Sequence, residues 1–222
     1  MKRIITVVIA GLILTACSKD IQQALEKAKA ESDPAKSLEV IRQAEKSYLE
    51  QCNSLRCSVP RSLVAADQEY FLKAAKLGNE RVLRELFTVR PDMIDLQNEM
   101  KGSVLIRAKD SKNADLLASA ARIYGNDTLG VVNKAQQIEY LKRAWAAGDV
   151  KSAGQLAHIY VRLKDFDNAY FWSLRCTQEC NRSVGVREGE YSTQTELLEL
   201  EKHLDANKIA TLQRESAARS GN

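Results

Sequence analysis

Five cysteines carry the most distinctive chemistry of this chain, and four of them form two closely spaced pairs. Cys52 and Cys57 lie in CNSLRC, and Cys176 and Cys180 lie in CTQEC. In an oxidising compartment four cysteines can pair in three ways, and the short spacings favour one local disulfide in each motif. The alternative is a metal site, but no histidine lies nearby and the spacings differ from those of a zinc ribbon. We therefore expect disulfides Cys52–Cys57 and Cys176–Cys180, and no metal ligands.

The fifth cysteine, Cys17, follows a segment with the layout of an export signal. Lys2 and Arg3 are followed by an uncharged apolar run of eleven residues, from Ile4 to Leu14. This length is typical of a signal peptide and falls well short of the roughly 20 apolar residues that a membrane-spanning helix needs. We therefore expect the segment to direct export.

The letters LTAC, which end at Cys17, resemble the bacterial lipobox, in which a branched apolar residue and two small ones precede a cysteine. The resemblance implies that residues 1–16 are removed, that the Cys17 thiol is diacylated and that the new amino group receives a third acyl chain. Two or more acyl chains hold a protein durably at a membrane. Ser18 replaces the Asp that commonly retains lipoproteins in the inner membrane, so the resemblance points to the outer membrane, facing the periplasm. The alternative is an ordinary secretory signal with a chance cysteine.

Composition favours an all-α fold and argues against nucleic acid as a partner. Lys and Arg total 33 against 29 Asp and Glu, and removal of Lys2 and Arg3 with the signal leaves 31 against 29. A net charge this small, without a basic patch interleaved with aromatics, does not indicate nucleic-acid binding. Three prolines, ten glycines and much Ala, Leu, Glu, Lys and Gln favour helices throughout.

The first segment of the mature chain reads as an antiparallel helical hairpin. Asp33 and Pro34 have the pattern of an N-cap followed by proline at the first helical position, and they separate two apolar stripes with helical spacing. The stripes consist of Ile21, Ala24, Leu25 and Ala28, and then of Leu38, Ile41, Ala44 and Tyr48.

The middle of the chain contains an internal repeat. YFLKAAKLGNERVLREL (70–86) aligns on YLKRAWAAGDVKSAGQL (140–156) without gaps, at an offset of 70 residues. NADLLASAARIY (113–124) aligns on DVKSAGQLAHIY (149–160) at an offset of 36 residues, which is close to half of 70. Chance helical periodicity is the alternative explanation.

At two positions of this repeat, the geometry of helix ends explains the residue type. Gly78 and Gly148 are expected to end a helix in the left-handed conformation that glycine adopts easily. Asn79 and Asp149 follow them and can cap the next helix.

This pattern resembles the Sel-one-like repeat (SLR), a relative of the tetratricopeptide repeat. One copy runs over 113–148, the next begins at Asp149, and an upstream half-copy covers 70–86. The resemblance implies an α-solenoid of antiparallel helix pairs. Two departures weaken the pattern: Cys176 stands where the family has Ala, and the segment RPDMIDLQNEMKGSVLIRAKD is irregular, which suggests an interrupted array.

We divide the chain into four parts on these grounds. After Cys180 a polar loop leads to two amphipathic segments, expected to be helices over 195–205 and 207–218 that cover the last repeat, as solenoids require. The parts are a signal peptide (1–16), a lipid-anchored hairpin (17–58), a repeat array (59–180) and a loop with capping helices (181–222).

Patterns that indicate catalysis were sought without success. His158 and His203 are isolated, and the sequence contains no HExxH, glycine-rich phosphate loop or GxSxG. We therefore expect no enzymatic activity and no cofactor beyond the covalent lipid on Cys17. The expected function is that of an adaptor or assembly component in a secretion or conjugation machine of the envelope. The alternative is a peptidoglycan-associated factor or a cell-wall enzyme.

In arrays of this family the first helices of successive hairpins line the concave face, which places 113–124 and 149–161 there. Their apolar positions are needed for packing, which leaves polar residues for an envelope protein partner. These residues are Arg122, Lys151, Gln155, His158 and Arg162. Since arginine engages carboxylates bidentately, they predict an acidic partner, and the alternative is that they are only solvated.

Overall fold

The computed structural model describes residues 19–52, 58–176, 180 and 193–218, and these residues form helices without any strand. The predicted all-α class is therefore confirmed for this part of the chain. Two compact units divide the chain, Met1–Val82 and Leu83–Asn222.

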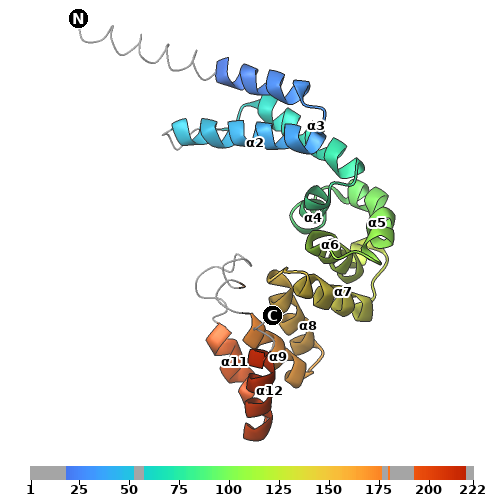
Figure 1. The fold of residues 1–222 in the computed structure, drawn as a ribbon, viewed down its shortest axis with the longest axis vertical. Coiled ribbons are helices and arrows are strands. Elements are labelled where there is room, and N and C mark those ends of the chain that lie inside the picture. Colours follow the sequence, from blue (N-terminus) through green and yellow to red (C-terminus); the bar gives the residue numbers. More distant parts are fainter. Residues whose placement is uncertain (1–18, 53–57, 177–179, 181–192, 219–222) are drawn as a thin grey trace, which may run out of the picture. The chain divides into compact units, whose positions relative to one another are not determined.

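The first unit is built from three helices that share one apolar centre. They are a helix over residues 19–30, α2 (Pro34–Gln51) and α3 (Arg61–Lys76), drawn in blue to green in Figure 1. The predicted start of α2 is confirmed, because the Asp33 carboxylate accepts a hydrogen bond from the Ala35 N–H at 2.9 Å. The predicted hairpin does not stand alone, since α3 adds a third wall to its buried centre. That centre consists of Ala28, Ile41, Leu63 and Ala66.

The second unit holds the remaining helices, and α4 (Glu80–Thr88) crosses from the first unit into it. In chain order they are α5 (Ile94–Ala108), α6 (Ala114–Gly125), η1 (Asp127–Leu129), α7 (Lys134–Ala146), α8 (Lys151–Arg162), α9 (Phe166–Arg175), α11 (Thr193–Glu201) and α12 (Ala206–Ala218). The closest packing joins α6 with α7 and α8 with α9, and α7 also packs on α8.

The two C-terminal helices pack against α9, as expected of helices that cover the last pair. Tyr170, almost fully buried on α9, donates a hydrogen bond to Glu201 at 2.8 Å and accepts one from Gln213 at 3.1 Å. Burial, together with the hydrogen bond to Glu201, raises the pKa of Tyr170 above its ordinary value. The Tyr170 hydroxyl therefore links α9 to both α11 and α12 by hydrogen bonds.

Most of the segment 90–110, whose repeat pattern is irregular, forms the continuous helix α5. Its buried apolar residues recur at every fourth position: Leu96, Met100, Val104 and Ala108. Two residues obscure this apolar pattern in the sequence: Gly102 lies inside the helix, and Ile106 is apolar but 78% exposed. The expectation that the repeat array is interrupted at this point stays a prediction.

Two predicted glycine turns are confirmed. Gly78 and Gly148 have φ values of 79° and 101°, in the left-handed region. In each turn the glycine N–H bonds three residues back, at 2.9 Å to Ala75 O and 3.0 Å to Trp145 O. The following N–H bonds five residues back to Ala74 O or Ala144 O, at 3.0 and 2.9 Å. Both turns are therefore Schellman motifs that satisfy the last carbonyls of α3 and α7.

A third turn of the same kind lacks glycine and was not predicted. Lys164 has a φ of 57°, and its N–H bonds to Val161 O at 3.0 Å, while the Asp165 N–H bonds to Tyr160 O at 3.0 Å. The Asp165 carboxylate then caps α9 by accepting from the Asn168 N–H at 3.2 Å. This turn joins α8 to α9.

The predicted caps after the two glycines differ in outcome. Asn79 caps α4, because its side-chain oxygen accepts from the Val82 N–H at 3.1 Å. Asp149 does not cap α8, whose N-cap is Val150 with no side-chain hydrogen bond. The Asp149 carboxylate is instead engaged by Arg84 and Ser152.

Candidate functional site

Four of the five residues predicted to bind a partner lie on one exposed stripe of α8. Lys151, Gln155, His158 and Arg162 are spaced so that they fall on the same side of the helix, and all four are exposed. The opposite side of α8 is buried, since Leu156 and Ala157 pack into the second unit. We call these four residues the α8 stripe.

Within the α8 stripe, Arg162 and His158 are paired. The Arg162 Nε donates to Nε2 of His158 at 3.1 Å, one helical turn away. Partial burial, and then the positive charge of Arg162, lower the pKa of His158 below its ordinary value. In this arrangement Nε2 of His158 acts as the acceptor and orients the guanidinium of Arg162. Lys151 and Arg162 supply the positive charge of the stripe. The expectation that these residues bind an acidic partner stays a prediction.

Arg122 is not joined to the α8 stripe. It lies exposed near the end of α6, and within the described chain no hydrogen bond or ion pair links it to the four residues of α8. The structure therefore brings together four of the five predicted residues and leaves Arg122 apart.

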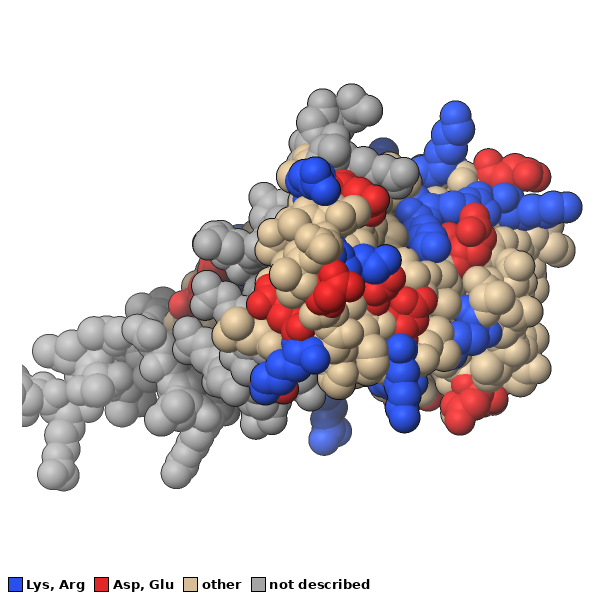
Figure 2. All heavy atoms as spheres, turned by 90° about the horizontal axis from the view of Figure 1, so that it is seen from below, with Lys and Arg blue, Asp and Glu red and all other residues tan. Residues whose placement is uncertain are grey.

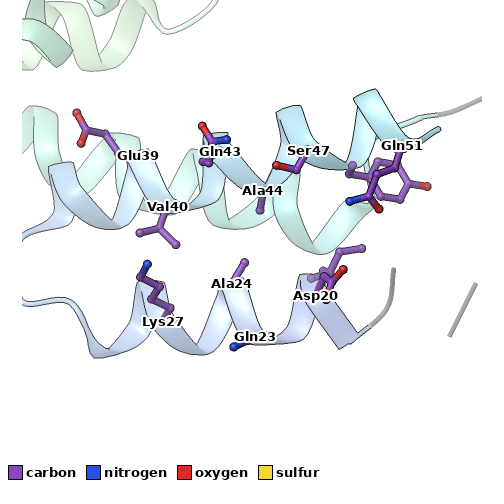
Figure 3. Close-up of a pocket in the computed structure, with 12 residues that line it drawn as sticks. Asp20, Gln23, Ala24, Lys27, Glu39, Val40, Gln43, Ala44, Ser47 and Gln51 are labelled. Atoms are coloured by element: carbon purple, nitrogen blue, oxygen red, sulfur yellow. The ribbon is translucent and has the colours of Figure 1, made fainter. Parts of the chain in front are cut away.

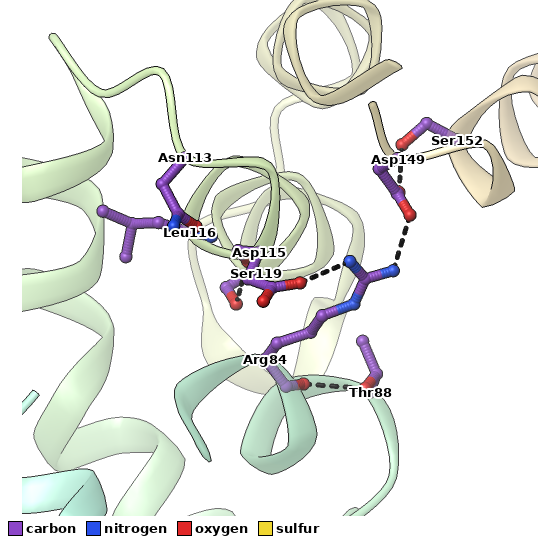
Figure 4. A network of polar contacts seen from close by, with 8 residues as sticks. All are labelled: Arg84, Thr88, Asn113, Asp115, Leu116, Ser119, Asp149 and Ser152. Carbon is purple, nitrogen blue, oxygen red and sulfur yellow. Dashed lines mark hydrogen bonds and ion pairs between the residues drawn. The ribbon is translucent and has the colours of Figure 1, made fainter. Parts of the chain in front are cut away.

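A partly buried ion-pair network that the sequence analysis missed joins α4, α6 and the start of α8 (Figure 4). Arg84 on α4 donates to Asp115 on α6 and to Asp149 before α8, each at 2.6 Å. The Ser152 hydroxyl donates to the second oxygen of Asp149 at 2.6 Å. Burial alone would lower the pKa of Arg84, but its hydrogen bonds to the carboxylates of Asp149 and Asp115 outweigh burial and hold that pKa above its ordinary value.

Two members of the network carry a local signal in the sequence, because they are acidic residues at helix starts. Asp115 and Asp149 lie at the amino ends of α6 and α8, where a carboxylate is favoured by the helix dipole. Nothing local in the sequence pairs them with Arg84, which lies 31 and 65 residues away along the chain. Because both carboxylates are already engaged, Arg84 holds the helices together and is not available to bind a ligand.

A second cation, Arg175, is enclosed by aromatic rings at the end of α9. Its guanidinium carbon lies 4.6 Å from the ring centre of Trp145 and 4.8 Å from that of Phe171, and the residue is 8% exposed. Trp145 also meets Trp172 edge-to-face at 5.3 Å. Such contacts favour a fixed position of α9 against α7.

The predicted disulfide Cys176–Cys180 is confirmed, with an S–S distance of 2.05 Å directly after Arg175. Cys52 ends α2 and is also disulfide-bonded. Its expected partner Cys57 and the expected lipid attachment site Cys17 lie outside the described residues.

A groove of about 700 Å³ lies in the first unit, between the helix over 19–30 and α2 (Figure 3). Asp20, Gln23 and Lys27 form one rim, and Glu39 and Gln43 lie on the other. Half-buried apolar side chains form the floor: Ile21, Ala24, Val40, Ala44 and Tyr48.

Charge is mixed on the face of the molecule drawn in Figure 2, where Lys and Arg side chains lie interspersed with Asp and Glu. In the described ranges no cluster of three or more His, Cys, Asp or Glu residues could hold a metal ion. None of the described helices is long and apolar enough to span a bilayer. The chain matches no protein-family model, no curated protein and no solved structure.

Proposed function

We propose that the chain is an outer-membrane lipoprotein, anchored through Cys17 and facing the periplasm. Its helices form a short solenoid of Sel-one-like pairs that binds another envelope protein. In this proposal it has no enzymatic activity and acts as an adaptor or assembly component of an envelope machine of the secretion or conjugation type.

The recurrence of one turn carries the solenoid part of the proposal. Gly78 and Gly148, 70 residues apart in aligned segments, make the same pair of backbone hydrogen bonds in the same left-handed conformation. The helix pairs α6–α7 and α8–α9 coincide with the two copies read from the sequence. A period of this kind supports an array of repeats, each packing on its neighbours.

The α8 stripe is the surface that we propose for the partner. Lys151 and Arg162 supply two positive charges, and His158 holds the Arg162 guanidinium in one orientation. A preoriented guanidinium loses less freedom when it binds a carboxylate bidentately. The partner proposed here is therefore a protein with an acidic segment.

The anchor is tested by metabolic labelling with palmitate and by separation of inner and outer membranes. Cys17→Ser is expected to lose the label, because the thioether that carries the acyl chains cannot form. Ser18→Asp is the matched control, since it should keep the label but move the protein to the inner membrane. Undiminished label in Cys17→Ser, or no label in the unmodified protein, contradicts the anchor.

The partner surface is tested by affinity capture from envelopes with charge-reversed variants. Lys151→Glu with Arg162→Glu should reduce capture of the partner at least tenfold without changing helicity. Lys112→Glu with Lys134→Glu reverses two exposed charges elsewhere in the second unit and should leave capture unchanged. Equal loss in both double variants would point to non-specific attraction and reject the α8 stripe.

A further inference from the structure

We propose that the groove between the helix over 19–30 and α2 binds the same helix of a second copy of this chain. The two helices over 19–30 then pair antiparallel about a two-fold axis. This inference rests on the first unit alone and does not depend on the lipid anchor or on the α8 stripe.

One face of the helix over 19–30 is left uncovered and lines the groove. Asp20, Gln23, Ala24 and Lys27 have the spacing that places residues on one helical face. The Asp20 and Lys27 side chains make no hydrogen bond or ion pair among the described residues. The rim therefore carries one free negative and one free positive charge at its two ends.

These two charges select an antiparallel second copy. Asp20 and Lys27 are separated by two helical turns, about 10 Å along the axis. Midway between them lies the peptide that joins Gln23 to Ala24. A two-fold axis at this peptide places Asp20 opposite Lys27 of the second copy, and the reverse pair follows by symmetry. A parallel pair would instead bring like charges together.

The floor of the groove provides the contact area for this arrangement. Ala24 lies near the axis, and its small side chain lets two helices approach closely. Val40 and Ala44 of α2 face the groove on the other side (Figure 3), and each would contact the incoming helix. Exposed ion pairs contribute little energy on their own, so the charges set the orientation while the apolar floor stabilises the pair.

Residues of α2 lie across the groove from both charges. In Figure 3 Lys27 lies across from Val40 and Glu39, and Asp20 lies across from Gln51. Glu39 is already paired with Arg81 at 3.2 Å, so Lys27 is left to engage the second copy.

The test is cross-linking of cysteine variants of the full chain in its own membranes. Gln23→Cys places a thiol beside the proposed axis, and a short bismaleimide should yield a species of twice the mass. Gln22→Cys is the matched control, because this exposed glutamine lies on the opposite side of the same helix. Circular dichroism of both purified variants checks that they remain folded.

Charge reversal separates a second copy from any other occupant. Added to Gln23→Cys, Asp20→Lys should reduce the cross-linked dimer at least fivefold. Combining Asp20→Lys with Lys27→Asp in one chain should restore the dimer, because the swapped charges again attract across the axis. Cross-linking to a protein of another mass, equal dimer from Gln22→Cys, absence of dimer from Gln23→Cys, or no rescue by the swap would each overturn the proposal.

Discussion

The Nη2 atom of Arg84 lies 2.6 Å from Oδ1 of Asp149, so a guanidinium on α4 neutralises a carboxylate whose side chain is only 4% exposed. A buried carboxylate without a counter-ion is strongly unfavourable. The start of α8, and with it the α8 stripe, therefore depends on a residue 65 positions earlier in the chain.

Arg84→Met is expected to lower the free energy of unfolding by about 3 kcal/mol, because it leaves Asp149 buried without its counter-ion. Adding Asp149→Asn should recover part of this loss, since the uncompensated charge is then gone. Arg81→Met removes an exposed pair with Glu39 and should lower the free energy of unfolding by less than about 1 kcal/mol. Urea unfolding followed by circular dichroism measures all three, and equal effects of the two arginine changes would contradict the role of Arg84.

Gly148→Val is expected to lower the free energy of unfolding by about 1 kcal/mol or more, because a β-branched residue strains at a φ of 101°. No heavy atom lies within 4 Å of a Cβ built on Gly148, so a Cβ meets open space and the expected strain comes from the backbone conformation. Gly102→Ala is the control: it also meets open space but lies inside α5, and should raise the free energy of unfolding by about 0.5–1 kcal/mol. Thermal melts in which both changes shift the melting temperature in the same direction would contradict this explanation.

The pKa of His158 offers a test of its pairing with Arg162. Arg162→Gln should raise this pKa part of the way toward its ordinary value, because burial remains as the larger cause. Lys151→Gln removes a charge from the same stripe and should leave the pKa of His158 unchanged. The pH titration of the imidazole signals by NMR measures both.

The sign of the pH dependence follows from the lowered pKa of His158. As the pH falls, His158 in the unfolded chain takes up a proton near the ordinary histidine pKa, and in the folded chain it does so only at lower pH. The contribution of His158 to stability is therefore complete above about pH 6.5, and it is lost as the pH falls from there through the folded-state pKa. A contribution that grew on acidification would contradict the lowered pKa of His158.

Cys176 and Cys180 should show no free thiol in protein isolated from the envelope. Intact-mass measurement after alkylation, with and without reductant, checks this. Cys176→Ser with Cys180→Ser should weaken the fold by about 2 kcal/mol without unfolding it, because the closed loop is short. Alkylation of both residues without reductant would contradict the disulfide.

The sequence was sufficient where a single residue type determines the geometry. Gly78, Gly148 and the pair Asp33-Pro34 were predictable, because left-handed turns and helix starts have few chemical solutions. Lys164 was not, since nothing in its type indicates a left-handed conformation.

Contacts between distant segments of the chain could not be predicted from a single sequence. To predict the ion pairs of Arg84, one would have to know that α4, α6 and α8 lie together. Arg143 provides a second example: it donates to the carbonyls of Ala108, Lys109 and Ser111, at 3.0, 2.8 and 3.0 Å. It thereby satisfies carbonyl groups at and just after the end of α5.

The central claim is that the α8 stripe contacts a specific envelope protein, and photo-cross-linking in living cells tests it most directly. A photoreactive amino acid at Gln155, in the middle of the stripe, should give one discrete adduct with another protein. The adduct should disappear when Lys151→Glu and Arg162→Glu are added, and the same probe at exposed Asn207 on α12 should not form it. No adduct at Gln155, the same adduct from Asn207, or an adduct that survives the charge reversal would contradict the account.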